Sequence, residues 1–375
     1  MEIINGEVVY MQIFDVGRSI NLDNIASVFP GIRYEKIKKT KDTPSTIDFP
    51  APFIIEVTNP AEFNSEKIHT IRIQANLYAD GVISLIARII FKNLQIEELH
   101  TLKNIDYKLE QRTFKIFKLM KYHFSLIHKK INKFINRGLY NFDPSETEKY
   151  TCFCITEGIN NTQEILNEKG KYIATLLIGE DPNLNLHPNQ ISNTLSHTFS
   201  FSEQDLIILD LDRCIIFDPS KDYEDILLII ELSNYQLLEL RTLDRLTDSR
   251  LKRAQSDVRG IYIKKKIVTR RLNKKLGRLY RLRIDLLFTL ENVENVSKLI
   301  GDFYLAQIYT DLGKIFQLDQ WSESIRMRFG ILNDIYSNAV GVSNERIILY
   351  VEILLGVIFT LEFILFVAEF IQLYF

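Results

Sequence analysis

The sequence predicts an α+β protein with two lobes, each a small sheet followed by a long helix, then a helical stalk and a transmembrane helix. Three observations predict this class: apolar residues that alternate with a period of two, longer segments where they recur every three or four residues, and an almost wholly apolar final run. The order of strands and then a helix occurs twice, as a weak repeat of architecture. The expected domains are the first lobe, the second lobe, the basic helix with the stalk, and the membrane anchor, at residues 1–145, 146–260, 261–345 and 346–375.

The first lobe carries the clearest hairpin pattern. Strand alternation is present at residues 8–14, 53–57, 71–77 and 82–91. Asp80 and Gly81 join the last two segments and form a turn pair typical of hairpins. From Lys103 to Arg137 the apolar residues recur at helical spacing with lysines between them, and Gly138 is a stop signal. We therefore expect a sheet followed by a basic helix.

The second lobe repeats this order. Strand patterns are present at residues 150–159 and 172–178, and a tight hairpin is predicted at 205–220. A long helix is expected over residues 223–251, because it is rich in Leu and Ile. Acids lie at its start and basic residues towards its end, which is the polarity that the helix dipole favours.

Beyond residue 260 the pattern is helical throughout. Helices are expected at about residues 264–294, 303–316 and 319–339, with Gly341 as a C-cap and Ser343 as the N-cap of a final helix. The third of these has apolar residues near heptad positions, interrupted by Arg328. An intramolecular helical hairpin and an intermolecular coiled coil both fit this pattern.

The last 29 residues, 347–375, predict a single-pass C-terminal membrane anchor. Twenty of them are Leu, Ile, Val or Phe. A helix of this length is about 43 Å long, more than the ~30 Å of a bilayer core. A buried or interfacial amphipathic helix is the alternative, because the longest charge-free stretch is short for a span.

Three carboxylates in this run fall on one side of the helix. Glu352, Glu362 and Glu369 lie within about one third of its circumference, at 100° per residue. Gly356 is about 40° from Glu352 and would let two backbones approach closely. Because a carboxylate in the middle of a span is costly unless it meets protein, these residues predict helix–helix contact in a homo-oligomer.

A basic stretch is the second candidate site. The net charge is only −2, but residues 250–283 carry fourteen Lys or Arg against one acid, and residues 115–137 carry seven and no acid. The candidate contacts for RNA phosphates or anionic lipid head groups are Lys264, Lys265, Lys266, Arg270, Arg271, Lys274 and Lys275. A solvated helix face is the simpler interpretation.

The three cysteines, Cys152, Cys154 and Cys214, are too few and too closely set for a disulfide scaffold, which favours a reducing compartment. The N-terminal segment has neither a basic flank nor the small-residue cleavage site of a signal peptide. We therefore expect the bulk of the chain to face the cytosol.

Other candidate motifs have simpler structural explanations. Gly170 and Lys171 lack the glycine spacing and the following Ser or Thr of a phosphate loop. Cys152 and Cys154 share a strand face but are expected as buried small side chains, and Asp210 with Asp212 fits a hairpin turn. His123 and His128 are five residues apart, so they lie on different sides of a helix. No catalytic residue, metal site or cofactor is therefore predicted.

Three segments resemble the required-for-meiotic-nuclear-division family. They are the hairpin QANLYADGVISLIARI, the basic segment GRLYRLR at residues 277–283, and VEILLGVIFTLE, whose Glu352 and Glu362 are ten residues apart. The chain departs from that family at LENVENVSKLIGDFYLAQIY, where a Pro-rich acidic stretch is usual, and at Ile353, where a Trp is usual. The resemblance implies a single-pass, oligomeric membrane protein without an established catalytic activity.

Taken together, the sequence predicts a membrane-bound scaffold or tether. Its expected partners are the lipid bilayer, further copies of itself, and RNA or anionic lipid, with no small-molecule substrate. A hydrolase or nucleotide-dependent enzyme is the alternative, and a pocket that joins Asp210, Asp212 and the basic helix would favour it.

Overall fold

The computed structural model describes residues 3–25, 28–29, 52–57, 68–109, 112–137, 143, 146–159, 161–262, 274–275, 277–278, 280, 284 and 302–374. The chain divides into two compact units. The first comprises Met1–Thr242 and Leu290–Trp321, and the second comprises Leu243–Thr289 and Ser322–Phe375. The four-part division expected from the sequence stays a prediction.

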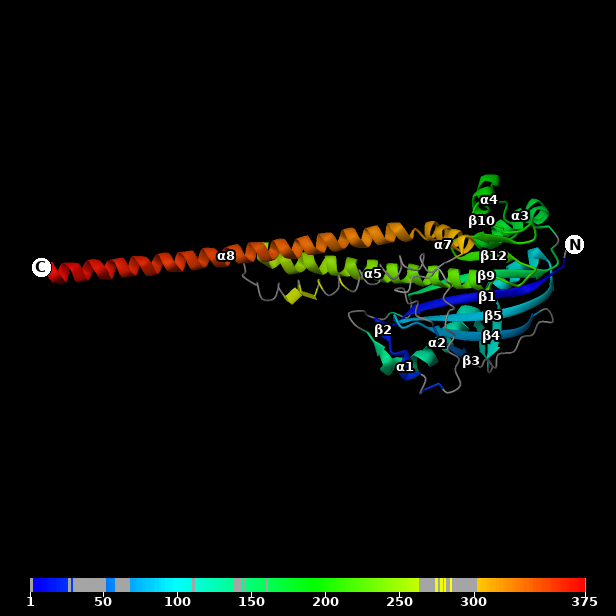
Figure 1. Cartoon of the computed structure of the whole chain (residues 1–375), viewed down its shortest axis with the longest axis horizontal. Coiled ribbons are helices and arrows are strands. Elements are labelled where there is room, and N and C mark those ends of the chain that lie inside the picture. Colours follow the sequence, from blue (N-terminus) through cyan, green and yellow to red (C-terminus); the bar gives the residue numbers. More distant parts are fainter. Residues whose placement is uncertain are drawn as a thin grey trace. The chain divides into compact units, whose positions relative to one another are not determined.

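An eight-stranded mixed sheet forms the centre of the first unit (Figure 1). Its strand order is β10-β11-β12-β9-β1-β5-β4-β3, and the neighbours are antiparallel except β9 and β12, which are parallel. The strands are β1 (Ile4–Asp15), β3 (Phe53–Val57), β4 (Ile68–Leu77), β5 (Val82–Leu94), β9 (Thr147–Glu157), β10 (Thr198–Phe199), β11 (Leu206–Leu209) and β12 (Arg213–Phe217).

The α+β class is confirmed, but the strands expected in two sheets lie in one. Strand β1 pairs with β5 of the first expected lobe on one side and with β9 of the second on the other. Its residues from Val8 to Phe14 are buried, so their backbone N–H and C=O groups need partners, and a strand from each half of the chain supplies these along the two edges. Alternation along a sequence predicts strands but not which strands pair.

One face of the sheet is covered by α2 (Ile116–Ile131), α3 (Thr162–Ile178) and the 3-10 helix η1 (Ile96–Asn104). The ring of Phe14 stacks on Phe124 of α2 at a centroid distance of 3.8 Å, and Tyr10 meets Phe117 edge-on at 5.8 Å. The hydroxyl of Tyr10 donates to the carbonyl of Leu102 in η1. These contacts belong to one core that extends from β3 to β12.

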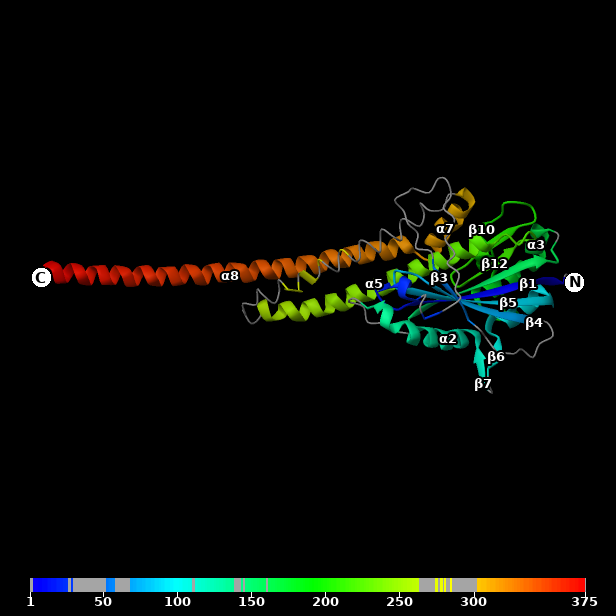
Figure 2. The same cartoon turned by 60° about the horizontal axis from the view of Figure 1, so that its bottom comes forward.

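The opposite face is covered by the first part of α5 (Glu224–Tyr262) and by α7 (Phe303–Ile315). Glu231 of α5 accepts hydrogen bonds from Asn76 and Tyr78 on that face, and Tyr309 of α7 donates to Gln236 of α5 at 2.8 Å. Figure 2 shows the strands between α2 and α5. The sheet is therefore the middle of three layers.

Short elements complete the first unit. Two small sheets pair β2 (Ser19–Ile20) with β8 (Ile135–Asn136) and β6 (Asp106–Leu109) with β7 (Arg112–Lys115). The remaining short helices are α1 (Leu22–Ile25), η2 (Asn132–Phe134) and α4 (Pro188–Thr194). The helix expected from Lys103 to Arg137 is thus shorter, because its first part forms the end of η1 and the β6–β7 hairpin.

The strand predicted at residues 172–178 is wrong, because these residues form the second half of α3. The side chain of Asn161 caps this helix by accepting from the backbone of Gln163 and Glu164, and Gly179 ends it with a left-handed backbone, φ 90°. Asn161 and Gly179 are both recognisable as capping residues in the sequence. The β-branched residues of the segment 172–178 nevertheless favoured a strand there.

In the second unit, the later part of α5 packs beside α8 (Leu318–Tyr374). Arg328, which interrupts the heptad pattern, donates to the Asp244 carboxylate of α5 at 2.6 Å. The boundary predicted at Gly341 and Ser343 is wrong, since α8 continues through both residues. One glycine costs a helix only about 1 kcal/mol, and Ser343 is buried in the packed part of α8.

Candidate functional site

Helix α8 contains an apolar segment that no described residue covers. Over Leu318–Glu369 the most apolar window has a mean hydropathy of 2.4, and none of it is buried. Between Ile347 and Ile371, the large apolar side chains that the structure describes are 36–67% exposed. The helix is therefore long and apolar enough to span a membrane, as the sequence predicts.

The predicted helix–helix contact residues lie in this exposed segment. Glu352, Gly356, Glu362 and Glu369 are all exposed on α8. A Cβ added to Gly356 would meet open space. The hydroxyl of Thr360 donates to the carbonyls of Gly356 and Val357 in its own helix, at 2.8 Å each. The acidic side of α8 is thus available to a partner, and its role in assembly stays a prediction.

Most of the predicted phosphate contacts lie outside the described residues. These are Lys264, Lys265, Lys266, Arg270 and Arg271. Lys274 and Lys275 are described, and they are exposed and half-buried, respectively. Their role in binding RNA or lipid stays a prediction.

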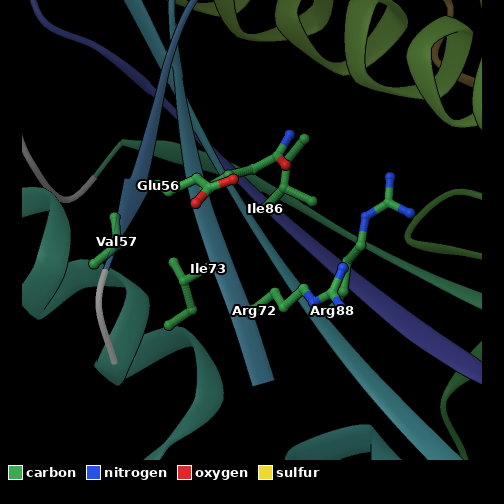
Figure 3. A pocket seen from close by; sticks show the side chains of 7 residues that line it. Glu56, Val57, Arg72, Ile73, Ile86 and Arg88 are labelled. Carbon is green, nitrogen blue, oxygen red and sulfur yellow. The ribbon is translucent and has the colours of Figure 1, made fainter. Parts of the chain in front are cut away.

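A cleft of about 440 Å³ opens at the edge of the sheet that β3 and β4 form, with β5 beside them (Figure 3). Its lining residues are Glu56, Val57, Arg72, Ile73, Gln74, Ile86 and Arg88. Neither Asp210 nor Asp212 lines it. It is therefore not the pocket that would favour the enzyme alternative.

Two arginines of this cleft are cross-strand neighbours. Arg72 on β4 pairs in register with Arg88 on β5, and Figure 3 shows their side chains side by side. Arg88 donates to both carboxylate oxygens of Glu224 at 2.6 Å and to Glu7 at 3.1 Å. Burial disfavours its charge, but the hydrogen bonds and charges of Glu224 and Glu7 outweigh this effect and raise the pKa of Arg88. Glu7 and Glu224 therefore offset the repulsion between Arg72 and Arg88, which lie opposite each other on neighbouring strands.

A buried polar cluster joins α5 to the sheet. Asn76 donates to both carboxylate oxygens of Glu231 at 3.0 and 3.2 Å, and the Tyr78 hydroxyl donates to it at 2.9 Å. One turn further along α5, the ring of Tyr235 stacks on Tyr78 at 5.7 Å and its hydroxyl donates to Asp80 at 3.4 Å. Burial raises the pKa of Glu231, against the effect of these donors.

Sequence reasoning missed this cluster, although a signal was present. Glu231, Tyr235 and Glu239 recur every four residues within an apolar helix, so they share one side of it. Burial raises the pKa of Glu239 well above its ordinary value, and the charges of Asp15 and Asp80 add to this effect. Within the described ranges, no group of three or more metal-ligating side chains comes together. The hydrogen bonds from Asn76 and Tyr78 to Glu231 make the cluster a polar contact between α5 and the sheet.

The other residues considered in the sequence lie in the buried core or in a turn. Cys152 and Cys214 are register partners on β9 and β12, are fully buried as free thiols, and have pKa values raised by burial. Gly170 is buried within α3. Asp210 accepts a hydrogen bond from the backbone of Leu211 in the β11–β12 turn, as turn chemistry predicts.

The described structure defines the class of protein as an α+β domain built on one mixed sheet, with a membrane-length helix. Residues 5–224, more than half of the chain, match the family model described as "Uncharacterized protein MJ0711, N-terminal domain". The chain therefore belongs to this family. The matched region contains nearly the whole sheet with α2 and α3, whereas almost all of α5 and all of α7 and α8 follow it.

One relative is the uncharacterized protein MJ0711 of Methanocaldococcus jannaschii, which is 30% identical over 202 residues. The match covers 53% of this chain and 59% of the relative, so the chain spans less than two thirds of the relative's length. No solved structure matches. The comparisons do not support the resemblance to the required-for-meiotic-nuclear-division family, and the family that matches carries no named function.

Proposed function

We propose that this protein is a membrane-anchored scaffold or tether, held by the apolar segment of α8, with the bulk of the chain facing the cytosol. One observation carries the proposal: between Ile347 and Ile371, the described large apolar side chains of α8 are exposed and no other described residue covers them. An apolar surface of this extent is stable in water only when something covers it.

Several features support the cytosolic orientation and the non-catalytic role. Cys152, Cys154 and Cys214 are free and buried, which suits a reducing compartment. The polar cluster around Glu231 is enclosed between helix and sheet, so it is better suited to holding α5 in place than to turning over a substrate. The basic residues from Lys264 to Lys275 are proposed to contact anionic lipid head groups or RNA.

Removal of the apolar segment tests the anchor. A chain that lacks residues 347–375 should move to the soluble fraction and remain folded, because no described residue of this segment is buried. The full chain should resist extraction with alkaline carbonate. Complete extraction of the full chain would overturn the integral anchor and leave a peripheral helix.

We further propose that the acidic side of α8 assembles copies of the chain. A mid-span carboxylate at Glu362 is costly in lipid, and contact between helices removes it from lipid. Glu362→Leu should keep the protein in the membrane while lowering the oligomer fraction in mild detergent. Equal assembly of the Leu variant, or a strictly monomeric natural chain in native membranes, would overturn this role.

A further inference from the structure

Helix α2 presents a mixed basic and apolar face to solvent. Its buried side, including Leu119, Met120 and Phe124, packs on the sheet. The residues that face outward are Lys118, Lys121, Tyr122, Ser125, Leu126 and Lys129. Tyr122 and Leu126 are 43% and 45% exposed and lie one turn apart, so they form an apolar strip between the lysines.

The charge of this face is one-sided. Residues 115–137 hold seven Lys or Arg and no acid. Lys118, Lys121 and Lys129 have no carboxylate partner in the part of the chain that the structure describes. At the end of the helix, Lys130 and Lys133 lie over the rings of Phe29 and Phe134, at 5.3 and 4.8 Å from the centroids. The outward lysines are thus left to interact with an external anion.

We propose that this α2 face binds the surface of an anionic bilayer. A helix that lies on such a surface places apolar side chains at the level of the head groups and lysines among the lipid phosphates. The inference rests on the proposed membrane anchor, which would attach the chain to a bilayer. RNA would also attract the lysines, but it gives no reason for an exposed leucine in the middle of the face.

The test uses the full chain in vesicles, with an environment-sensitive dye on Ser125→Cys. Ser125 is exposed between Tyr122 and Leu126, and the three natural cysteines are buried, so the dye reacts at the new site. In vesicles with 30% phosphatidylglycerol the emission should shift to the blue, and in pure phosphatidylcholine it should not. A dye on Leu211→Cys, in the exposed β11–β12 turn, should report no difference.

Substitution of the lysines measures how much their charge contributes to binding of the bilayer. Each lysine near an anionic surface contributes about 1 kcal/mol, which is about fivefold in the ratio of bound to free helix. Lys121→Gln with Lys129→Gln should therefore lower that ratio about 25-fold. Lys92→Gln with Lys314→Gln removes the same charge from exposed positions elsewhere and should leave the ratio unchanged.

The outcomes separate the two proposals. If the chain does not float with vesicles at all, the membrane anchor fails. If it floats but the dye at position 125 responds equally in both lipids, or the two double variants behave alike, the α2 proposal is overturned and the anchor stands. A dye response to added RNA, without one to phosphatidylglycerol, would assign the face to nucleic acid instead.

Discussion

Replacement of Glu231 by Ala should lower the free energy of unfolding, because it removes the acceptor at the centre of the polar contact between α5 and the sheet. The carboxylate of Glu231 is the hydrogen-bond acceptor for the amide of Asn76 and the hydroxyl of Tyr78. Asn76 is 4% exposed and Tyr78 is 1% exposed, so water cannot replace the lost acceptor without opening the interface. A buried donor without a partner costs about 1–3 kcal/mol. Two such donors predict a loss of about 2–6 kcal/mol in the free energy of unfolding.

Urea unfolding of a chain that lacks residues 347–375 measures this loss. The only tryptophan, Trp321, reports on the same unit, since Arg241 of α5 lies over its ring at 5.9 Å. Asp225→Ala is the matched control on the same helix, because Asp225 is exposed and a substitution there should change the free energy of unfolding by no more than about 0.5 kcal/mol. A loss at Glu231 no larger than that at Asp225 would refute the reasoning.

The same residue predicts a pH dependence. Because burial raises the pKa of Glu231 above 4.5, its contribution to stability is fully present below pH 4.5 and is lost as pH rises through the raised pKa. The amide of Glu231→Gln does not titrate. The stability of the natural chain minus that of the Gln variant should therefore fall as pH rises from 4.5. A difference that stays constant with pH would show that Glu231 does not titrate at a raised pKa.

Three further substitutions test the fold by thermal or urea unfolding. Phe124→Ala should cost about 3–5 kcal/mol, because it leaves a cavity under the ring of Phe14, and a cost below about 1 kcal/mol would contradict this packing. Gly81→Ala should destabilise strongly, because φ is 92° and the new Cβ would lie 1.8 Å from the carbonyl oxygen of Gly17, and a neutral result would exclude this turn geometry. Asn161→Ala should cost about 1 kcal/mol through loss of the α3 cap, whereas Asn161→Asp should retain most of it.

The sequence predicts most strands of the sheet but not their partners. Alternation identified β1, β3, β4, β5, β9, β11 and β12, because each has at least one buried face. Pairing depends on contacts between residues up to about 150 positions apart, such as Val8 with Phe153, and no local pattern specifies these. The two halves therefore looked like separate lobes although β1 joins them.

Local signals also competed with one another in α3 and α8. At residues 172–178, Ile173 and Thr175 favour a strand, but the caps at Asn161 and Gly179 and burial against the core determine a helix. At Gly341 the cost of a glycine is smaller than the gain from packing, so the helix continues. The buried cluster around Glu231 was missed because its partners, Asn76 and Tyr78, lie some 150 residues away.

The burial pattern along α8 favours lipid over protein as the cover of its apolar segment. Earlier in the helix the buried residues, Ile325, Leu332, Tyr336, Ala339 and Ser343, follow steps of three, four and seven, which is the one-sided pattern of a helix against another helix. From Ile347 onwards apolar residues occur on nearly every side. A second helix covers only the stripe that faces it, whereas a bilayer covers the whole circumference. The side that carries Glu352, Glu362 and Glu369 is the exception, because carboxylates are costly in lipid. This difference is the basis of our proposal that lipid covers most of the segment and that a second copy of the chain covers its acidic side.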